Sequence, residues 1–209
     1  MTSILVVGSV AYDTVETPFG RAERVLGGSA SFFSLAASFF VPVNLVAVVG
    51  TDFAQEHVDR LAAHNIDMEG LQRADGLSFF WEGRYSFDLN ARETVRTDLN
   101  VFQSFRPRIP EKYRHSSHVF LGNIDPVLQQ EVLDQVERPR LVALDTMNFW
   151  IEGRLDELKK ALRRVKAAKV GGRYRFAGFL SRCTLIPIED LVKTGDEQPA
   201  ATSEAPADA

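Results

Sequence analysis

Short apolar runs separated by polar segments recur along most of the chain. Four of these runs, at residues 4–7, 43–49, 118–122 and 141–144, are nearly continuous in apolar side chains. Runs of this kind are typical of parallel strands that are covered on both faces. Segments between them, at residues 32–40, 53–64, 126–136 and 152–169, are predicted to be helices. The alternation predicts an α/β fold, a doubly wound parallel sheet with right-handed crossovers.

Residues 77–102 have a different pattern, because apolar and polar side chains alternate on either side of the turn-forming Asp88, Leu89 and Asn90. Such alternation predicts an antiparallel pair with one packed face, a β flap that serves as a lid or a dimer surface. A plain peripheral hairpin is the alternative. Residues 16–25 are predicted to form a small hairpin, and residues 65–70 a loop.

The glycine pair Gly27–Gly28 predicts a tight turn where the backbone can approach a ligand. Ser29 or Ser31 is predicted to cap the helix that follows, whose N–H groups and dipole favour an electronegative ligand. The body of this helix is apolar on nearly every side, which predicts cover by the sheet and by neighbouring helices. The alternative is a helix start that merely needs glycines.

Polar residues gather where the predicted strands end. Because parallel strands bring their carboxyl ends to one edge, these residues are predicted to form a binding site there. An acidic residue just past a strand is suited to holding hydroxyl groups, although a turn former is the common alternative. Thr51 and Asp52 are predicted to cap the helix at 53–64. The residues predicted at this edge are Asp13, Gly27, Gly28, Asn123, Asp145 and Asn148.

Composition narrows the choice of function. The chain of 209 residues has 45% hydrophobic and 25% charged residues, a net charge of −4 and a pI near 5.6. This balance is typical of a globular protein and argues against a nucleic-acid partner. Cys183 is the single cysteine, and neither His57 nor His64 has a second ligand at metal-site spacing, so no metal site is predicted. Without a signal-like or membrane-spanning run, a cytoplasmic chain with no membrane partner is expected.

Several segments resemble, in order and spacing, the N-terminal part of the PfkB (ribokinase-like) carbohydrate and nucleoside kinases. These are GSVAYD, LGGSASFFSLAASFFVPVNLVAVVGTDF, FLGNIDP and LDTMNFW, within residues 3–165. The resemblance implies a Rossmann-like (ribokinase-like) parallel sheet with flanking helices and a β-flap lid over residues 1–167. It also implies phosphorylation of a sugar or nucleoside with ATP and Mg²⁺.

The same resemblance implies roles for individual residues. Asp13, Gly27 and Gly28 hold the substrate hydroxyls, and Asn123 is a polar substrate contact. Phe32 stands where many members have asparagine, which leaves the substrate class open. Ser31, Phe32, Asp145 and Asn148 are further candidates for the substrate site.

The catalytic half of the family pattern is missing from the sequence. Neither the Gly-Ala-Gly-Asp turn, which supplies the base and the anion hole, nor the Asn-x-x-Glu motif is present. Thr194–Gly195–Asp196 is read as a chance match, so no catalytic residue is assigned. Residues 168–209 diverge from the family, and their polar, Pro- and Ala-rich end predicts disorder. The chain is therefore expected to be inactive alone and C-terminally incomplete, with a sugar-binding or dimerising module, or a non-functional fragment, as alternatives. A homodimer through the flap is the expected protein partner.

Overall fold

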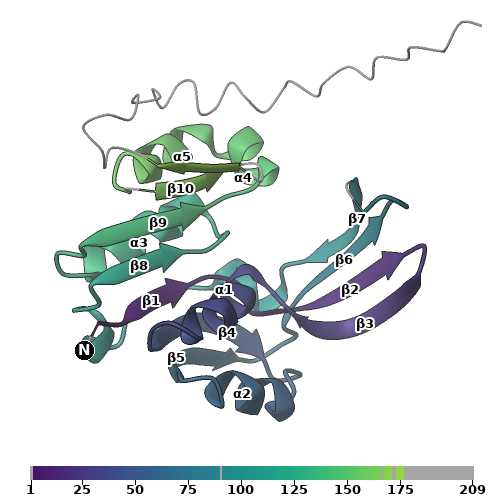
Figure 1. The fold of residues 1–209 in the computed structure, drawn as a ribbon, viewed down its shortest axis with the longest axis horizontal. Helices are drawn as coiled ribbons and strands as arrows, with labels where there is room; N and C mark the ends of the chain where they lie inside the picture. Colours follow the sequence, from purple (N-terminus) through teal and green to yellow (C-terminus); the bar gives the residue numbers. More distant parts are fainter. Residues whose placement is uncertain (1, 90, 166, 171–172, 177–209) are drawn as a thin grey trace, which may run out of the picture.

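A large parallel sheet forms the centre of the molecule. The computed structural model describes residues 2–89, 91–165, 167–170 and 173–176. The sheet has the strand order β11-β10-β9-β8-β1-β4-β5, and all its pairs are parallel except β10–β11 (Figure 1). Its strands are β1 (Ile4–Val7), β4 (Val43–Gly50), β5 (Ile66–Ala74), β8 (His118–Leu121), β9 (Leu141–Asp145), β10 (Ala167–Val170) and β11 (Arg173–Phe176). The four strands expected from the apolar runs are thereby confirmed as members of one sheet.

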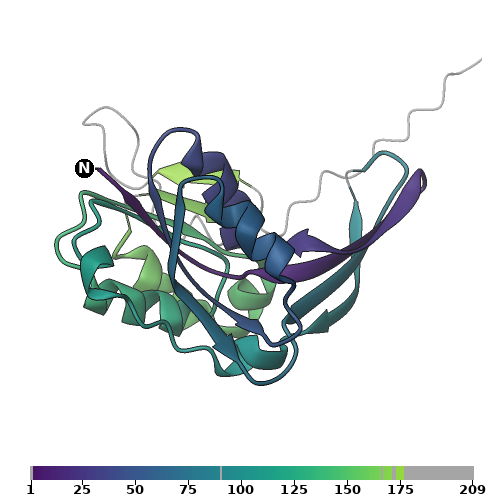
Figure 2. The ribbon, with the colours of Figure 1, turned by 90° about the horizontal axis from the view of Figure 1, so that it is seen from below.

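Helices cover both faces of this sheet. They are α1 (Ser29–Ser38), α2 (Gln55–Ala62), α3 (Pro126–Gln135), α4 (Asn148–Gly153) and α5 (Leu155–Leu162), with short 3₁₀ helices at Asn100–Ser104 and Glu111–Tyr113. The helices α1 and α2 lie on one side, and α3 lies on the other (Figure 2). Alternate residues of β1 and β4 enter two separate buried clusters, since Leu5 and Val46 face one side while Val6 and Leu45 face the other.

A second sheet of four strands, the lid, projects beyond one end of the large sheet (Figure 1). Its order is β3-β2-β6-β7, with β2 (Ala11–Thr17), β3 (Gly20–Gly27), β6 (Phe79–Tyr85) and β7 (Arg92–Asp98). The predicted flap is confirmed as the antiparallel pair β6–β7. However, it makes up only half of the lid, because β2 and β3 form a second long hairpin and β2 pairs in parallel with β6.

Two predicted boundaries are wrong. Residues 66–74 form the edge strand β5 beside β4, although residues 65–70 were predicted to form a loop, because pairing with a buried neighbour stabilises a segment in which polar and apolar residues are mixed. The helix predicted at 152–169 is instead the two short helices α4 and α5, divided at Arg154, followed by strand β10. Arg154 has φ −142° and ψ 37°, which is not helical backbone.

The prediction that the sheet and neighbouring helices enclose α1 on nearly every side is also wrong. The side chains that α1 buries completely are small ones, Ala30, Ser31 and Ser34. In contrast, Phe32 is 58% exposed, and Phe40, just past the helix, is 90% exposed. A helix that packs closely on a sheet needs small residues at the contact, so Phe32 faces outward here, whereas Phe33 packs against Phe120 of β8. Within the described residues, no helix is long and apolar enough to cross a membrane.

Candidate functional site

Asp13 lies in the middle of β2, between Val25 of β3 and Trp81 of β6. Its carboxyl group lies directly over Gly27, where an added Cβ atom would come within 2.1 Å of Cγ of Asp13. Only glycine leaves room for the carboxyl group in this position. The first glycine of the pair therefore positions Asp13.

The environment of Asp13 is unusual for a surface carboxylate. Burial raises its pKa from 3.8 to about 6, although a hydrogen bond from the backbone of Gly28 and the charge of Arg92 oppose this increase. No described lysine or arginine forms an ion pair with it. A half-buried carboxylate without such a partner is characteristic of a functional position.

Gly28 begins helix α1 and has φ +97°, a conformation that side chains other than glycine rarely adopt. An added Cβ atom there would lie 2.3 Å from the carbonyl oxygen of Ser9. The caps predicted at Ser29 and Ser31 are wrong, because the N-cap is Gly28, which has no side chain to accept a capping hydrogen bond. The buried hydroxyl of Ser31 instead donates to the carbonyl oxygen of Gly27 at 2.7 Å, which supports the turn.

The first N–H groups of α1 already have partners. Those of Ser29 and Ala30 donate to the hydroxyl and the carbonyl oxygen of Ser9, at 3.0 Å each. The backbone of Gly28 interacts with Asp13. The carboxyl group of Asp13 thus lies where the positive end of the helix dipole favours negative charge.

The hydroxyl of Ser29 joins three parts of the site. It lies 3.1 Å from Ser9 Oγ, just after β1, and accepts a hydrogen bond at 3.1 Å from the N–H of Asn123, just after β8. Asp13, the glycine pair and Asn123 are therefore gathered around the start of α1. Neither Ser9 nor Ser29 was predicted to link strands, because two serines twenty residues apart carry no local pattern.

The side chain of Asn123 is held by residues at the start of α4. Its Oδ1 accepts from Trp150 Nε1 at 3.0 Å, and its Nδ2 lies 2.8 Å from the sulfur of Met147. The remaining predicted residues lie in neighbouring elements. Asp145 is the last residue of β9, Asn148 is the first residue of α4, and Phe32 is in the first turn of α1.

Asp52 does not cap α2, which begins at Gln55. Its Oδ1 accepts hydrogen bonds from the N–H and the hydroxyl of Ser78, both at 2.7 Å, and its Oδ2 accepts from Arg24 at 3.0 Å. Burial by itself would raise the pKa of Asp52, but these hydrogen bonds outweigh it and lower the pKa. Since Ser78 precedes β6 and Arg24 lies in β3, Asp52 attaches both lid hairpins to the large sheet.

Metal-binding side chains do not cluster in the part of the chain that the structure describes. None of the described His, Cys, Asp and Glu side chains form a group of three that could hold a cation. The N-terminus of α1 is satisfied by Ser9 and Asp13, and that of α3 is capped by Asp125, which accepts from the N–H of Val127 at 2.8 Å. At each of these two helix starts, some of the first N–H groups are therefore already engaged within the chain.

Several proteins to which this chain is similar in sequence or in fold are kinases. The chain is 28% identical over 142 residues to a cytidine kinase of Thermococcus kodakarensis, a match that covers 68% of this chain and 50% of that protein. A fructokinase of Xylella fastidiosa, solved with bound ATP, superposes with a TM-score of 0.61 at 17% identity. The match covers 80% of this chain and 60% of the fructokinase chain. This chain has the ribokinase-like fold.

A nucleoside kinase of Burkholderia thailandensis in complex with inosine superposes on this ribokinase-like chain with a TM-score of 0.56 at 13% identity. That match covers 86% of this chain and 77% of the other. No protein-family model matches the sequence. The resemblance to the N-terminal part of ribokinase-like kinases is confirmed, and the chain spans about half the length of the curated relative it matches.

Proposed function

We propose that this chain is the substrate-holding part of a ribokinase-type kinase, in which Asp13 binds adjacent hydroxyl groups of a sugar or of a nucleoside ribose. The observation that carries the proposal is the carboxyl group of Asp13, half-buried over Gly27 and without an ion pair among the described residues. An ionised carboxylate accepts two hydroxyl hydrogen bonds, and each is stronger than a bond between neutral groups.

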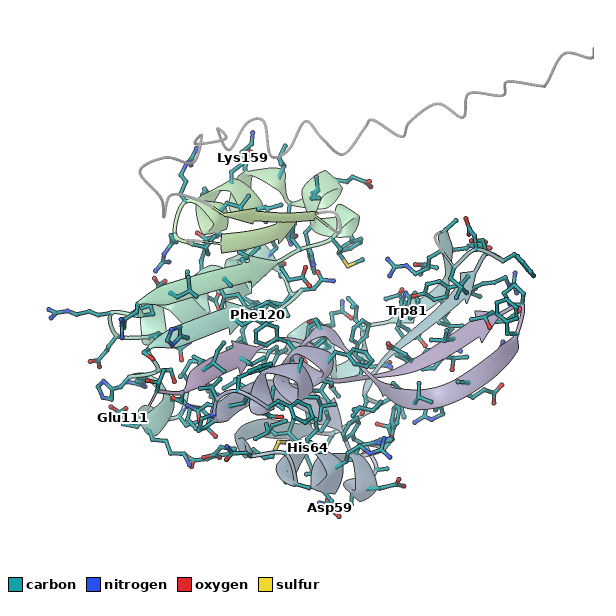
Figure 3. All side chains as sticks on the ribbon, viewed as in Figure 1. Asp59, His64, Trp81, Glu111, Phe120 and Lys159 are labelled. Carbon is teal, nitrogen blue, oxygen red and sulfur yellow. The ribbon has the colours of Figure 1, made fainter. Side chains whose placement is uncertain are left out.

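Calorimetric titration of pentoses, hexoses and nucleosides tests this role. Replacement of Asp13 by Asn should weaken binding by roughly ten- to one-hundredfold, because hydrogen bonds to a charged group contribute about 1.5–3 kcal/mol. The matched control is Asp59→Asn, since Asp59 is exposed on α2, away from the lid (Figure 3). Equal affinities of the wild type and both variants for every ligand would place the site elsewhere.

We do not propose that the isolated chain transfers a phosphoryl group. The transfer needs a base and an anion hole, and the sequence lacks the Gly-Ala-Gly-Asp turn that supplies both in the family. In the presence of ATP and Mg²⁺, we expect no phosphorylation of any ligand that binds. Turnover that depends on both ATP and Mg²⁺ and is abolished by Asp13→Ala would contradict this expectation.

Self-association through the lid is a second candidate role. At its tip, Phe19 and Phe87 are 70% and 75% exposed, and their ring centroids are 5.4 Å apart. Two adjacent exposed aromatic rings favour a protein contact. Sedimentation velocity should show a dimer that the double variant Phe19→Ser, Phe87→Ser dissociates. A wild-type chain that sediments as a monomer at high concentration would exclude this role.

A further inference from the structure

Trp81 is the neighbour of Asp13 on the lid. The parallel pairing of β2 with β6 places these two residues in register, so both side chains lie on the same face of the sheet. Strands in a sheet are about 4.8 Å apart, which is within the reach of one small ligand. Trp81 lies near the base of the lid (Figure 3).

The indole of Trp81 lies flat along this face. An added Cβ atom at Gly83 would come within 2.0 Å of the indole Cη2, so the absence of a side chain at Gly83 leaves the space that the ring fills. The indole Nε1 lies 3.4 Å from Thr94 Oγ1 on β7, which fixes the rotation of the ring. The result is a flat aromatic surface beside the carboxyl group of Asp13.

Arg92 of β7 completes the group. Its guanidinium carbon is 5.3 Å from the centroid of the Trp81 ring, and its charge acts on Asp13. Among the described residues, Arg92 has no carboxylate partner, whereas Arg84 and Arg96 on the opposite face of the same two strands are paired with Glu16 and Asp98. The guanidinium N–H groups of Arg92 therefore remain available to a ligand.

We propose that Trp81 and Arg92 form a subsite for the base of a nucleoside, so that the ligand of this chain is a nucleoside with a carbonyl-bearing base. This inference rests on the proposed function, because Asp13 holds the ribose hydroxyls. The base stacks on the indole, and the guanidinium of Arg92 donates to a ring carbonyl such as that of cytosine, uracil or hypoxanthine. Adenine has no carbonyl group and binds less tightly.

Calorimetric titration of cytidine, adenosine and ribose against the whole chain tests the subsite. Loss of stacking in Trp81→Ala should weaken cytidine binding about ten- to one-hundredfold, while ribose binding stays unchanged. Trp81→Phe, which keeps an aromatic face, should retain most of the affinity. Arg92→Ala should weaken cytidine more than adenosine. Arg96→Ala is the matched control, because Arg96 lies over the ring of Phe80 on the opposite face, also at 5.3 Å.

The outcomes separate this inference from the proposed function. If Asp13→Asn weakens every ligand but Trp81→Ala and Arg92→Ala leave cytidine and ribose binding unchanged, the base subsite is overturned and the role of Asp13 stands. If none of the three ligands binds the wild type, the base subsite is overturned, and the proposed function is overturned as well if no other pentose, hexose or nucleoside binds. Circular dichroism and thermal melts show whether Trp81→Ala is folded. If it is not, the titrations of Trp81→Phe and Arg92→Ala decide whether the base subsite exists.

Discussion

Asp13 illustrates a conflict between stability and function at the scale of one residue. Its folded-state pKa of about 6 is above its ordinary value of 3.8, so the folded chain retains a proton that the unfolded chain loses. Stability contributed by this group is therefore present below pH 4 and falls as the pH rises to about 6. The chain keeps a carboxylate that destabilises it at neutral pH.

Replacement of Asp13 by Asn should consequently stabilise the chain above pH 6. We expect a gain of about 1–2 kcal/mol in the free energy of unfolding at pH 7.5. This gain is smaller than the free energy that corresponds to the whole pKa shift, because the carboxyl group is partly exposed to solvent. Arg92 is the charged group that acts on Asp13, and the gain should be larger when Arg92 is replaced by Ala. Urea denaturation between pH 4 and pH 8 measures the difference, which should nearly vanish at pH 4. A gain that is independent of pH would contradict the raised pKa.

The two adjacent glycines should differ in their response to substitution. Gly27→Ala should displace the carboxyl group of Asp13 and weaken ligand binding, with a modest loss of stability. Gly28→Ala should destabilise the chain by about 1–3 kcal/mol, because it forces a side chain into a strained conformation beside Ser9. Gly153→Ala is the control, since an added Cβ atom there meets nothing within 4 Å. Thermal melts together with ligand titration separate the two effects.

At the scale of elements, the lid depends on the few residues that attach it. Ser78 donates twice to Asp52, and its hydroxyl also accepts the N–H of Gly50 at 3.0 Å in a buried position. The side chain of Asn100 donates to the carbonyl oxygen of Ser78 at 2.9 Å. Ser78 therefore links the end of β4, the start of β6 and the chain that leaves β7.

Ser78→Ala should loosen the lid more than it disturbs the large sheet. It leaves the buried N–H of Gly50 without its partner, which costs about 1–3 kcal/mol. Hydrogen exchange should accelerate in β2 and β6 relative to β1 and β8. Ser38→Ala removes one hydrogen bond at the end of α1 and serves as the control. Equal acceleration in both sheets would show that Ser78 supports the whole fold, not the lid.

At the scale of the whole molecule, the helices that the structure describes cover the two faces of the large sheet unequally. On one face, α3 and α5 bury Val119, Leu121, Val142 and Leu144 of β8 and β9. On the other face, α1 and α2 cover β1, β4 and β5, and Phe33 of α1 stacks on Phe120 of β8 at 3.6 Å between ring centroids. Beyond this contact, Leu141 of β9 is 39% exposed. Strands of parallel sheets are usually buried on both faces, so this area is unusual.

The isolated chain should therefore bind hydrophobic dyes and associate weakly. Phe32 of α1 and Phe40, just past the end of this helix, are both exposed. The double variant Phe32→Ser, Phe40→Ser should lower the fluorescence of anilinonaphthalene sulfonate and raise solubility, with a change in the free energy of unfolding within about 0.5 kcal/mol. The lid variant Phe19→Ser, Phe87→Ser is measured for comparison, because its two exposed rings lie on the other sheet. Dye fluorescence that only the lid variant lowers would place the apolar surface at the lid.

The sequence by itself determined the elements whose signals are local. Buried strands are apolar throughout, so β1, β4, β8 and β9 were recognised from their composition. The β6–β7 pair follows from alternation around one turn, and α3 from a proline in the first turn after Asp125. The glycine pair was identified as a candidate because it predicts a tight turn before a helix, and Asp13 because it follows a predicted strand at the same edge of the sheet.

Only the tertiary structure decided the features that depend on partners distant in the sequence. β5 mixes polar and apolar residues without a clear local signal, and it becomes a strand because β4 lies beside it. The parallel pairing of β2 with β6 joins residues nearly seventy positions apart, and it places Trp81 beside Asp13. Asp52 has the local pattern of a helix cap but holds Ser78 and Arg24 instead. Hydrogen bonds and packing with distant partners outweigh local preferences of less than about 1 kcal/mol per residue, so such features cannot be predicted from neighbouring residues alone.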